Sequence, residues 1–463
     1  MKKIFYTILA VGMLGACQTL DQEPSTSITA DTAIQSVEDL AKAVNGAYYL
    51  ATYGDQFTLA SELAIYADEL GPDSKVDKGS GQFAQKIHER SITSNDSWNA
   101  YGYLYRAIAN INKAIEKAKA LEDQEGAAPY IAELIGVRGL FHFHLATFFA
   151  PIPTSNNTKN TMGIVLSTEV YPLDYKGARA TLDQTYQQII DDLTTYIKTG
   201  YNKDKMDGHL NYWAALAIRA RAYLYWGKNA EALADAKEVI EKSPYKLYTP
   251  ANYVSVWAED NAGDEVILEY VQDDDYNAQR YAPGYYTHPD GYTEFLVTDE
   301  FYNFMQANPK DIRSKMVAYR ASETGKGTPG YFPMKYPGKK GSAVPLYSHN
   351  IKVVRLAEMY LIAAEASLKK DGAAAAVPYL NTLRKNRIED YTDATTTDID
   401  DIINERRKEL FAEGQIAFDY WRNGKSITSG ARTFAPDDDF NVLPIPKEEL
   451  DVCGKVLVQN PGQ

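Results

Sequence analysis

The segment at residues 212–244 reads YWAALAIRARAYLYWGKNAEALADAKEVIEKSP and carries the clearest repeat signal in the chain. Its signature positions recur at regular short spacing: Leu216, Ala220, Tyr223, Gly227, Ala232, Ala236, Val239 and Pro244. This is the tetratricopeptide pattern, in which small residues let two antiparallel helices pack closely and a proline ends the second. Arg219 departs from the pattern, because a leucine is usual there. The segment predicts a pair of packed helices.

A second segment, residues 353–387, repeats this spacing. Its matching positions are Tyr360, Ala363, Ala364, Ala376, Leu380 and Leu383, with Asp371 and Gly372 at the turn. Glu365 and Lys369 are four residues apart, so we expect them to form an ion pair on the solvent side of the first helix. One such pair cannot bury its own apolar face, so several pairs should stack. The chain is predicted to be all-α, with tetratricopeptide-like pairs as its scaffold.

Residues 272–350, between the two pairs, differ in composition from the rest. They are rich in Gly, Pro and Asp, and they contain many tyrosines: Tyr276, Tyr281, Tyr285, Tyr286, Tyr292, Tyr331, Tyr336 and Tyr347. A loop-rich insertion of this length in a helical scaffold is usually functional, although a packed cover over the helices is the alternative. We therefore expect one domain over residues 36–463. Its parts are a helical part at 36–271, this insertion at 272–350 and a second helical part at 351–463.

The N-terminus has the layout of a lipoprotein signal peptide. Lys2 and Lys3 precede an apolar stretch, and the sequence Leu-Gly-Ala-Cys at residues 14–17 resembles the bacterial lipobox. In a lipobox, the chain is cut before the cysteine and the cysteine sulfur is acylated. We expect residues 1–16 to be removed, Cys17 to carry lipid, and the polar residues 17–35 to form a tether. An ordinary signal peptide that happens to contain a cysteine is the alternative.

Composition narrows the classes of partner. The chain has 463 residues and is 45% apolar, as is typical of a globular protein. Its formal net charge of −14 argues against binding to nucleic acid, because phosphates select basic surfaces. The basic run at residues 406–408 lies among glutamates and predicts a salt-bridged helix face. No apolar run beyond the signal peptide is expected to span a bilayer, so attachment should depend on the lipid. With Cys17 lipidated, Cys453 has no partner for a disulfide within the chain.

Motifs for catalysis or metal binding are weak. The GxGxxG at residues 325–330 follows no buried strand and opens no helix, and no GxSxG elbow or pair of carboxylates stands out. His142 and His144 are two apart on an expected helix and so point to different faces. The acidic runs at 273–275 and 437–439 lack the spacing of an EF-hand, although calcium there stays open. We expect no catalysis, no cofactor and no metal site.

Six segments, in chain order, carry a further pattern. They are residues 98–114 with Trp98 and Tyr105, 138–143 with 151–153, 219–225, 354–366 with 380–384, 403–414, and 443–446 with 459–462. Together these segments resemble the SusD/RagB family of outer-membrane nutrient-binding lipoproteins of Bacteroidetes. The second segment departs from the family, which often has an Arg-Ala pair and Gly-Asp-Val-Pro there. The resemblance covers most of the mature chain.

The resemblance implies both a fold and a role. Family members have tetratricopeptide-like helix pairs and a loop-rich side that carries the ligand site. They sit in the outer membrane as a lid on a SusC-like TonB-dependent transporter, capture ligand outside the cell and deliver it for import, without catalysis. Asp21 and Glu23 are compatible with the acidic export signal of many surface lipoproteins of this phylum. A lipid-anchored, surface-exposed protein is therefore expected.

Ligand residues do not transfer by motif, because family ligand sites come from variable loops. Position and chemistry select seven candidates, from the loop at 68–74 and from the insertion: Asp73, Asn277, Tyr281, Tyr285, Tyr286, Tyr331 and Tyr336. Tyrosine rings would contact a sugar face, while the acid or the amide would exchange hydrogen bonds with hydroxyls. Trp98 and Tyr105, on a helical stripe, are expected in the core.

The leading hypothesis is an oligosaccharide or polysaccharide ligand. A peptide, as in the RagB branch, is the second, because the chain has only five tryptophans. A tetratricopeptide-type scaffold that holds another protein without a nutrient ligand is the third, and an enzyme is a remote fourth.

Overall fold

The computed structural model describes residues 33–53, 57–77, 84–96, 100–204, 208–259, 263–325, 327–429 and 431–463. The predicted signal peptide, the lipidation at Cys17 and most of the tether at 17–35 lie outside the described residues, as does Trp98. Tyr105 packs against the core, and its hydroxyl donates to the Val165 carbonyl at 2.7 Å.

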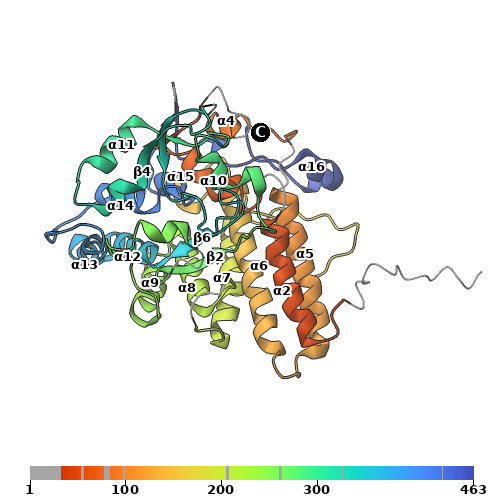
Figure 1. The fold of residues 1–463 in the computed structure, drawn as a ribbon. Coiled ribbons are helices and arrows are strands. Elements are labelled where there is room, and N and C mark those ends of the chain that lie inside the picture. The colour runs from red at the N-terminus through yellow and green to blue at the C-terminus, as the bar shows by residue number, and fades with distance from the viewer. Residues whose placement is uncertain are drawn as a thin grey trace, which may run out of the picture.

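A row of helices forms the scaffold (Figure 1). Its members are α2 (Val37–Thr52), α5 (Ala100–Ala118), α6 (Ala127–Phe149), α7 (Leu182–Thr199), α8 (Tyr212–Trp226), α9 (Asn229–Lys242), α12 (Leu356–Asp371), α13 (Ala373–Lys385) and α14 (Ile399–Leu410). From α2 to α13 each packs on the next, with α9 packed on α12 although the insertion separates them in sequence, and α14 packs on α12. The two predicted pairs, α8 with α9 and α12 with α13, therefore stack on each other. This confirms the predicted helical scaffold.

The pair α8 and α9 shows why this sequence folds as it does. α8 begins after Asn211, whose side-chain oxygen accepts from the Ala214 amide at 2.8 Å, and ends at Gly227, which has a φ of 80°. Arg219, the residue that departs from the repeat pattern, donates from Nε and Nη2 to the two carboxylate oxygens of Asp235 on α9, each at 2.7 Å. An inter-helix ion pair thus replaces the usual leucine contact.

α6 corrects one expectation. The stretch Ala127–Ser155, which contains this helix, is long and apolar enough to cross a membrane by length and composition, so the expectation that no such run exists was wrong. In the fold, 89% of its apolar window is buried. α5 and α7 pack on either side of it, so its hydropathy reflects a central place in the core.

The insertion leaves the helical row and returns to it at one place. β2 (Val266–Tyr270) pairs with β6 (Ile351–Arg355) in antiparallel register, with Tyr270 opposite Ile351. Directly after β2, the Gln272 amide donates to Oδ1 of Asn350 at 2.9 Å. The ends of the segment 272–350 are therefore fixed to each other.

Short elements fill the rest of the molecule, above the row in Figure 1. They are α3 (Tyr66–Glu69), β1 (Ser74–Lys75), α4 (Ala84–His88), α10 (Pro283–Tyr286), β3 (Leu296–Val297), α11 (Asp299–Gln306), β4 (Val317–Arg320), β5 (Gly330–Pro333), α15 (Ile416–Trp421), β7 (Ile427–Ser429), β8 (Arg432–Phe434) and α16 (Lys447–Cys453). Single turns of 3-10 helix are η1 (Glu62–Ala64), η2 (Lys119–Leu121), η3 (Pro153–Ser155), η4 (Ser255–Ala258), η5 (Gln279–Tyr281), η6 (Ile312–Met316), η7 (Asp439–Asn441) and η8 (Gly454–Val456).

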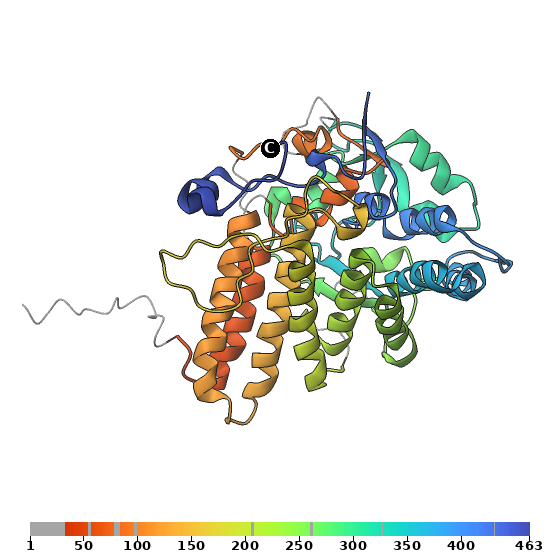
Figure 2. The same ribbon diagram turned by 180° about the vertical axis from the view of Figure 1, so that it is seen from behind.

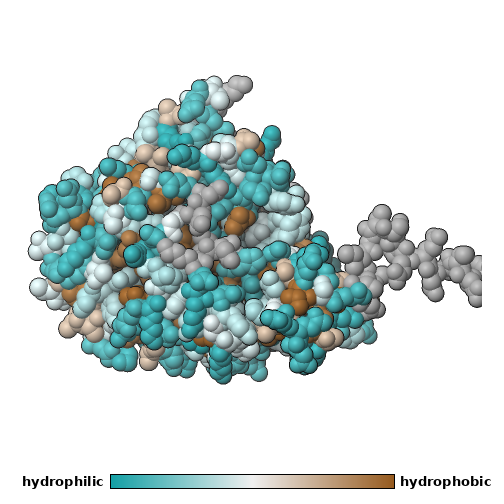
Figure 3. Space-filling view, turned by 60° about the horizontal axis from the view of Figure 1, so that its bottom comes forward, coloured by the Kyte–Doolittle hydropathy of each residue, from teal (hydrophilic) through white to brown (hydrophobic). Residues whose placement is uncertain are grey.

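The short strands form antiparallel pairs. β1 pairs with β3, β4 with β5 and β7 with β8. Figure 2 shows from behind that the long connection from α6 to α7 runs outside the row. On the face that Figure 3 shows, apolar side chains form small separate patches among hydrophilic ones.

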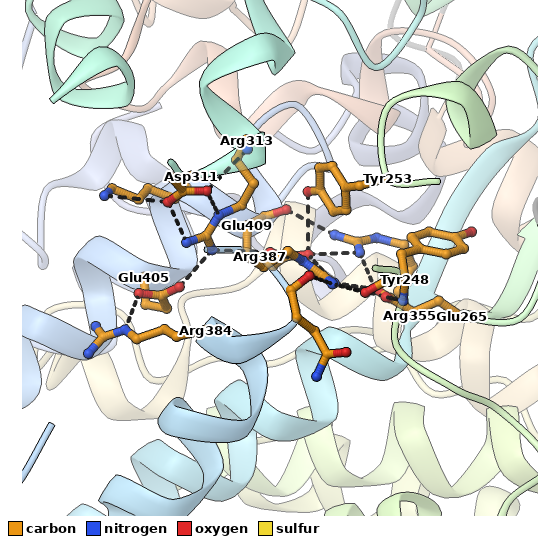
Figure 4. Close-up of polar contacts among 12 residues, drawn as sticks. Tyr248, Tyr253, Glu265, Asp311, Arg313, Arg355, Arg384, Arg387, Glu405 and Glu409 are labelled. Carbon is orange, nitrogen blue, oxygen red and sulfur yellow. Dashed lines mark hydrogen bonds and ion pairs between the residues drawn. The ribbon is translucent and has the colours of Figure 1, made fainter. Parts of the chain in front are cut away.

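A buried ionic hub joins the insertion to the helices (Figure 4). We define it as Glu265, Asp311, Arg313, Arg355, Arg387, Glu405 and Glu409. Glu409 of α14 is 0% exposed and accepts from Arg355 and Arg387 at 3.0 Å each and from Arg313 at 3.2 Å. Burial raises the pKa of Glu409, but the charges of Arg387, Arg355 and Arg313 hold it well below its usual range.

The basic run at 406–408 on α14 forms ion pairs, as predicted, but part of this face is buried. Arg406 is fully buried and donates to Asp419 at 2.6 Å. Glu365 of α12, predicted to face solvent, is also 0% exposed and accepts from both Lys369 and Arg422. Periodicity missed both because α12 and α14 are covered on more than one side.

Candidate functional site

Asp73 is held inside the protein. It is 2% exposed, and its two carboxylate oxygens accept from Nε and Nη2 of Arg407 at 2.9 and 2.5 Å. Burial raises the pKa of Asp73, and the hydrogen bonds from Arg407 offset part of that rise. In this position Asp73 ties the loop at 68–74 to α14 and does not reach a ligand.

Asn277 is also occupied by internal bonds. Its amide nitrogen donates to the carbonyls of Asp273 and Asp274 at 2.9 and 3.1 Å, and its oxygen accepts from the Gln279 amide at 2.9 Å. These bonds close a tight turn at the start of the insertion. Asn277 therefore shapes a loop.

Two of the candidate tyrosines belong to the core. Tyr286 is buried and its hydroxyl donates to Oε1 of Glu62 at 2.6 Å. Tyr336 is buried and its hydroxyl donates to the Ala412 carbonyl at 3.0 Å. Because their rings are covered, we do not carry these residues forward as ligand platforms.

Tyr331 lies on a different surface from the other candidates. Its ring stacks on Tyr302 of α11, with centroids 3.9 Å apart, and Tyr319 of β4 meets it edge-on at 5.7 Å. Tyr281, in η5, is partly buried against the core. The insertion therefore distributes its tyrosines over several places.

The tyrosine–arginine cluster is the candidate site, and we define it as Arg280, Tyr285, Tyr292 and Tyr347. Tyr285 contacts Tyr292 and Tyr347 edge-on, with centroids at 4.9 and 5.4 Å. The Arg280 side chain is exposed, and hydrogen bonds to the Tyr292 and Tyr347 hydroxyls raise its pKa. All three tyrosines are partly exposed. The cluster thus presents aromatic faces, hydroxyls and one fixed positive charge.

Two glycines make this cluster possible by close approach. A Cβ on Gly291 would lie 1.9 Å from the Tyr285 carbonyl oxygen, and a Cβ on Gly284 would lie 2.4 Å from the Leu346 carbonyl oxygen. The Tyr292 amide donates to the Tyr285 carbonyl at 3.0 Å. A side chain at either glycine would push these loops apart.

Two buried carboxyl groups, Glu62 and Asp68, have a raised pKa. Burial raises the pKa of Glu62, the partner of Tyr286, to about 7. Burial likewise raises the pKa of Asp68 to about 8, although its carboxylate accepts from the amides of Ala412 and Gly414. Protonation of Glu62 therefore helps to stabilise the packing of Tyr286, which is next to Tyr285 in the chain.

The arrangement is suited to binding. Tyrosine rings offer flat apolar faces to the CH groups of a sugar ring, and a guanidinium donates hydrogen bonds to hydroxyl or carboxylate oxygens. Among the described residues, no three His, Cys, Asp or Glu side chains are grouped so as to hold a metal ion.

Sequence reasoning named only Tyr285 of this cluster. Tyr292 and Tyr347 were noted as members of the tyrosine-rich region but were not selected, and Arg280 was missed. A signal for them exists in the glycines at 284 and 291, which mark close backbone approach around Tyr285. The contact with Tyr347 joins residues far apart in the chain, so spacing alone could not reveal it.

Comparisons with known proteins agree on one family. A family model described as "Starch-binding associating with outer membrane" matches residues 19–224, and the model of the SusD family matches residues 179–462. A SusD-like protein of Formosa agariphila is 23% identical over 520 residues, a match that covers 97% of this chain and 96% of the relative.

Solved structures give the same result. A SusD superfamily protein from Bacteroides thetaiotaomicron is 27% identical with a TM-score of 0.84, and the match covers 92% of this chain and 100% of that one. A laminarin binding SusD-like protein is 21% identical with a TM-score of 0.74, covers 92% of this chain and 99% of that one, and shares the fold.

Proposed function

Because the chain belongs to the SusD family, we propose that it is a lipid-anchored outer-membrane protein that binds an oligosaccharide or polysaccharide at the tyrosine–arginine cluster. The observation that carries this proposal is the surface grouping of Tyr285, Tyr292 and Tyr347 around Arg280. Rings held by one another present their faces at a low cost in conformational entropy.

The proposal extends to location and delivery. Lipid on Cys17 and the tether at 17–35 would hold the protein at the cell surface, in keeping with a family description that names the outer membrane. A SusC-like TonB-dependent transporter would receive the ligand, and no catalysis by this chain is proposed. Replacing Cys17 with Ser should release the protein from membranes and leave ligand binding intact.

A glycan suits the cluster better than a peptide does. Partly exposed phenol rings match the flat faces of sugars, whereas a peptide relies on backbone hydrogen bonds from an exposed strand edge. A peptide nevertheless stays the second candidate, because the Arg280 guanidinium is a fitting partner for a peptide carboxylate.

The test is binding of purified protein to a glycan panel that includes laminarin and soluble starch. We expect Tyr285→Ala and Tyr347→Ala each to weaken binding at least about fivefold. Tyr285→Phe, which keeps the ring, should retain most of the affinity. Tyr175→Ala is the matched control, since Tyr175 is another exposed tyrosine and lies outside the cluster.

The same binding assay, extended to protein digests, separates the glycan, peptide and scaffold hypotheses. Retention of protein digests with no glycan bound would replace the sugar with a peptide ligand. A folded protein that binds neither, yet co-purifies with a transporter, would instead support the tetratricopeptide scaffold without nutrient binding.

A further inference from the structure

A groove runs along α2, and none of the residues of the tyrosine–arginine cluster lines it. It consists of two adjoining cavities of about 540 and 310 Å³ that share Asn45 and His209 in their walls. We call it the α2 groove. One end is lined by Tyr49, Tyr53 and Tyr276, and the other end is polar.

The tyrosine end exposes stacked rings. Tyr49 and Tyr53, four residues apart at the end of α2, stack with centroids 4.5 Å apart and planes inclined by 21°. Tyr276, from the insertion, meets both edge-on at 6.0 and 5.7 Å. Tyr49 is 43% exposed and Tyr276 is 55% exposed, so the group leaves aromatic surface open to a ligand.

Tyr276 is held in place before any ligand arrives. Its amide donates to Oδ1 of Asp273 at 2.6 Å, and Asn277 closes the turn behind it. Asp274 fixes this turn to another part of the insertion by accepting from the Ala343 amide at 3.1 Å. A preorganised ring of this kind costs little entropy on binding.

A polar group in the groove lacks a partner. Gln272 is 3% exposed and lines the cavity beside these tyrosines. Its amide nitrogen donates to the Val271 carbonyl at 2.8 Å, while its Oε1 has no hydrogen-bond partner among the described residues. A buried acceptor without a partner is costly, so a turn of the Gln272 side chain that brings Oε1 to a ligand hydroxyl in the cavity would contribute to binding.

The polar end sets the charge of the ligand. Glu133 and Asp204 line it, and Glu133 accepts from the Tyr48 hydroxyl at 3.0 Å and pairs with His209 at 2.9 Å. Carboxylates in the wall disfavour a phosphate, sulfate or uronate group. They readily accept hydrogen bonds from neutral hydroxyls.

We propose that the α2 groove is a second binding site for an uncharged saccharide chain, in addition to the tyrosine–arginine cluster. This inference rests on the proposed glycan-binding function. Two sites on one polysaccharide would act together, since binding at one raises the effective concentration at the other.

The test uses affinity electrophoresis of the full chain without its signal peptide, in gels that contain laminarin or soluble starch. In a polysaccharide that retards the wild type, we expect Tyr49→Ala combined with Tyr276→Ala to weaken binding about tenfold. Gln272→Leu, which removes the acceptor at similar volume, should weaken it about fivefold. Tyr175→Ala is the control, because Tyr175 also belongs to an exposed stacked pair, with Tyr171 at 4.0 Å.

The outcomes are distinct once unchanged thermal unfolding shows that the variants fold. Unchanged retardation of the groove variants, with loss in Tyr285→Ala, overturns the second site and leaves the proposed function standing. A wild type that no glycan of the panel retards overturns both. Equal loss in the Tyr175→Ala control also overturns the second site, because the effect would not be specific to the groove.

Discussion

The ionic hub and the tyrosine–arginine cluster are both assembled from distant segments. They differ in how completely their side chains are paired within the protein. In the hub, Glu409 meets three guanidinium groups and is sealed from water. In the cluster, the rings around Arg280 contact one another and leave faces exposed. Side chains that are fully paired inside the protein hold the scaffold together, whereas rings with exposed faces remain available to a ligand.

The largest expected effect comes from breaking the hub. Glu409→Gln removes the negative charge that Arg313, Arg355 and Arg387 share, and leaves buried positive charge without compensation. We expect a loss of about 3–5 kcal/mol in the free energy of unfolding, measured with denaturant. Glu38→Gln, which breaks only the exposed pair with Lys42, should cost less than about 0.5 kcal/mol. Equal losses in the two variants would contradict the contrast between hub and surface.

The second prediction concerns Glu62, the buried carboxyl group that accepts a hydrogen bond from Tyr286. Burial raises the pKa of Glu62 from its ordinary 4.5 to about 7, so its protonated form stabilises the fold below pH 4.5, and this contribution is lost as the pH rises through about 7. Glu62→Gln removes this dependence and keeps an acceptor for the Phe57 amide. The stability of the variant relative to wild type should rise by up to about 3 kcal/mol between pH 4.5 and 7.

Unfolding curves collected at pH 4.5, 6 and 7 measure this change. Curves for wild type and variant that stay parallel across the range would show that Glu62 is ionised in the folded protein. Glu38→Gln serves again as the control, because its carboxylate is exposed.

The smallest expected effect is on glycan binding at the tyrosine–arginine cluster. Gly291→Ala would set a methyl group against the Tyr285 carbonyl and displace the turn that carries Tyr292. We expect glycan affinity to fall by about 1–3 kcal/mol, measured by calorimetry, with only a minor change in the hub. Gly102→Ala, at a helix glycine of α5 with open space around it and no positive φ, is the control for a glycine substitution. Affinity that survives in Gly291→Ala would separate ligand binding from the geometry of the cluster.

Much of the scaffold could be predicted because its signals are local. The helix pairs at 212–244 and 353–387 follow from spacing and from turn residues such as Gly227. The insertion was visible through its composition, and the strands β2 and β6 that flank it lie at the limits expected for it.

The interior chemistry and the site could not be predicted, because both depend on tertiary contacts. Arg406 and Glu365 look like surface charges in a single helix and are buried only because other elements cover them. Asp73 has the chemistry of a ligand residue, but Arg407, far along the chain, takes up its carboxylate. Tyr347 reaches Tyr285 only because the loop before it rests on Gly284.

The contact of α9 with α12 has a consequence for how the chain folds. α9 ends at Lys242 and α12 begins at Leu356, so the whole insertion has to be synthesised before the two helices can meet. Contacts between such distant segments slow folding. Until α12 arrives, the face of α9 that will pack on it stays exposed, so the half-made chain is open to aggregation. The first repeats can fold early, and the docking of α12 then becomes the late step that completes the row.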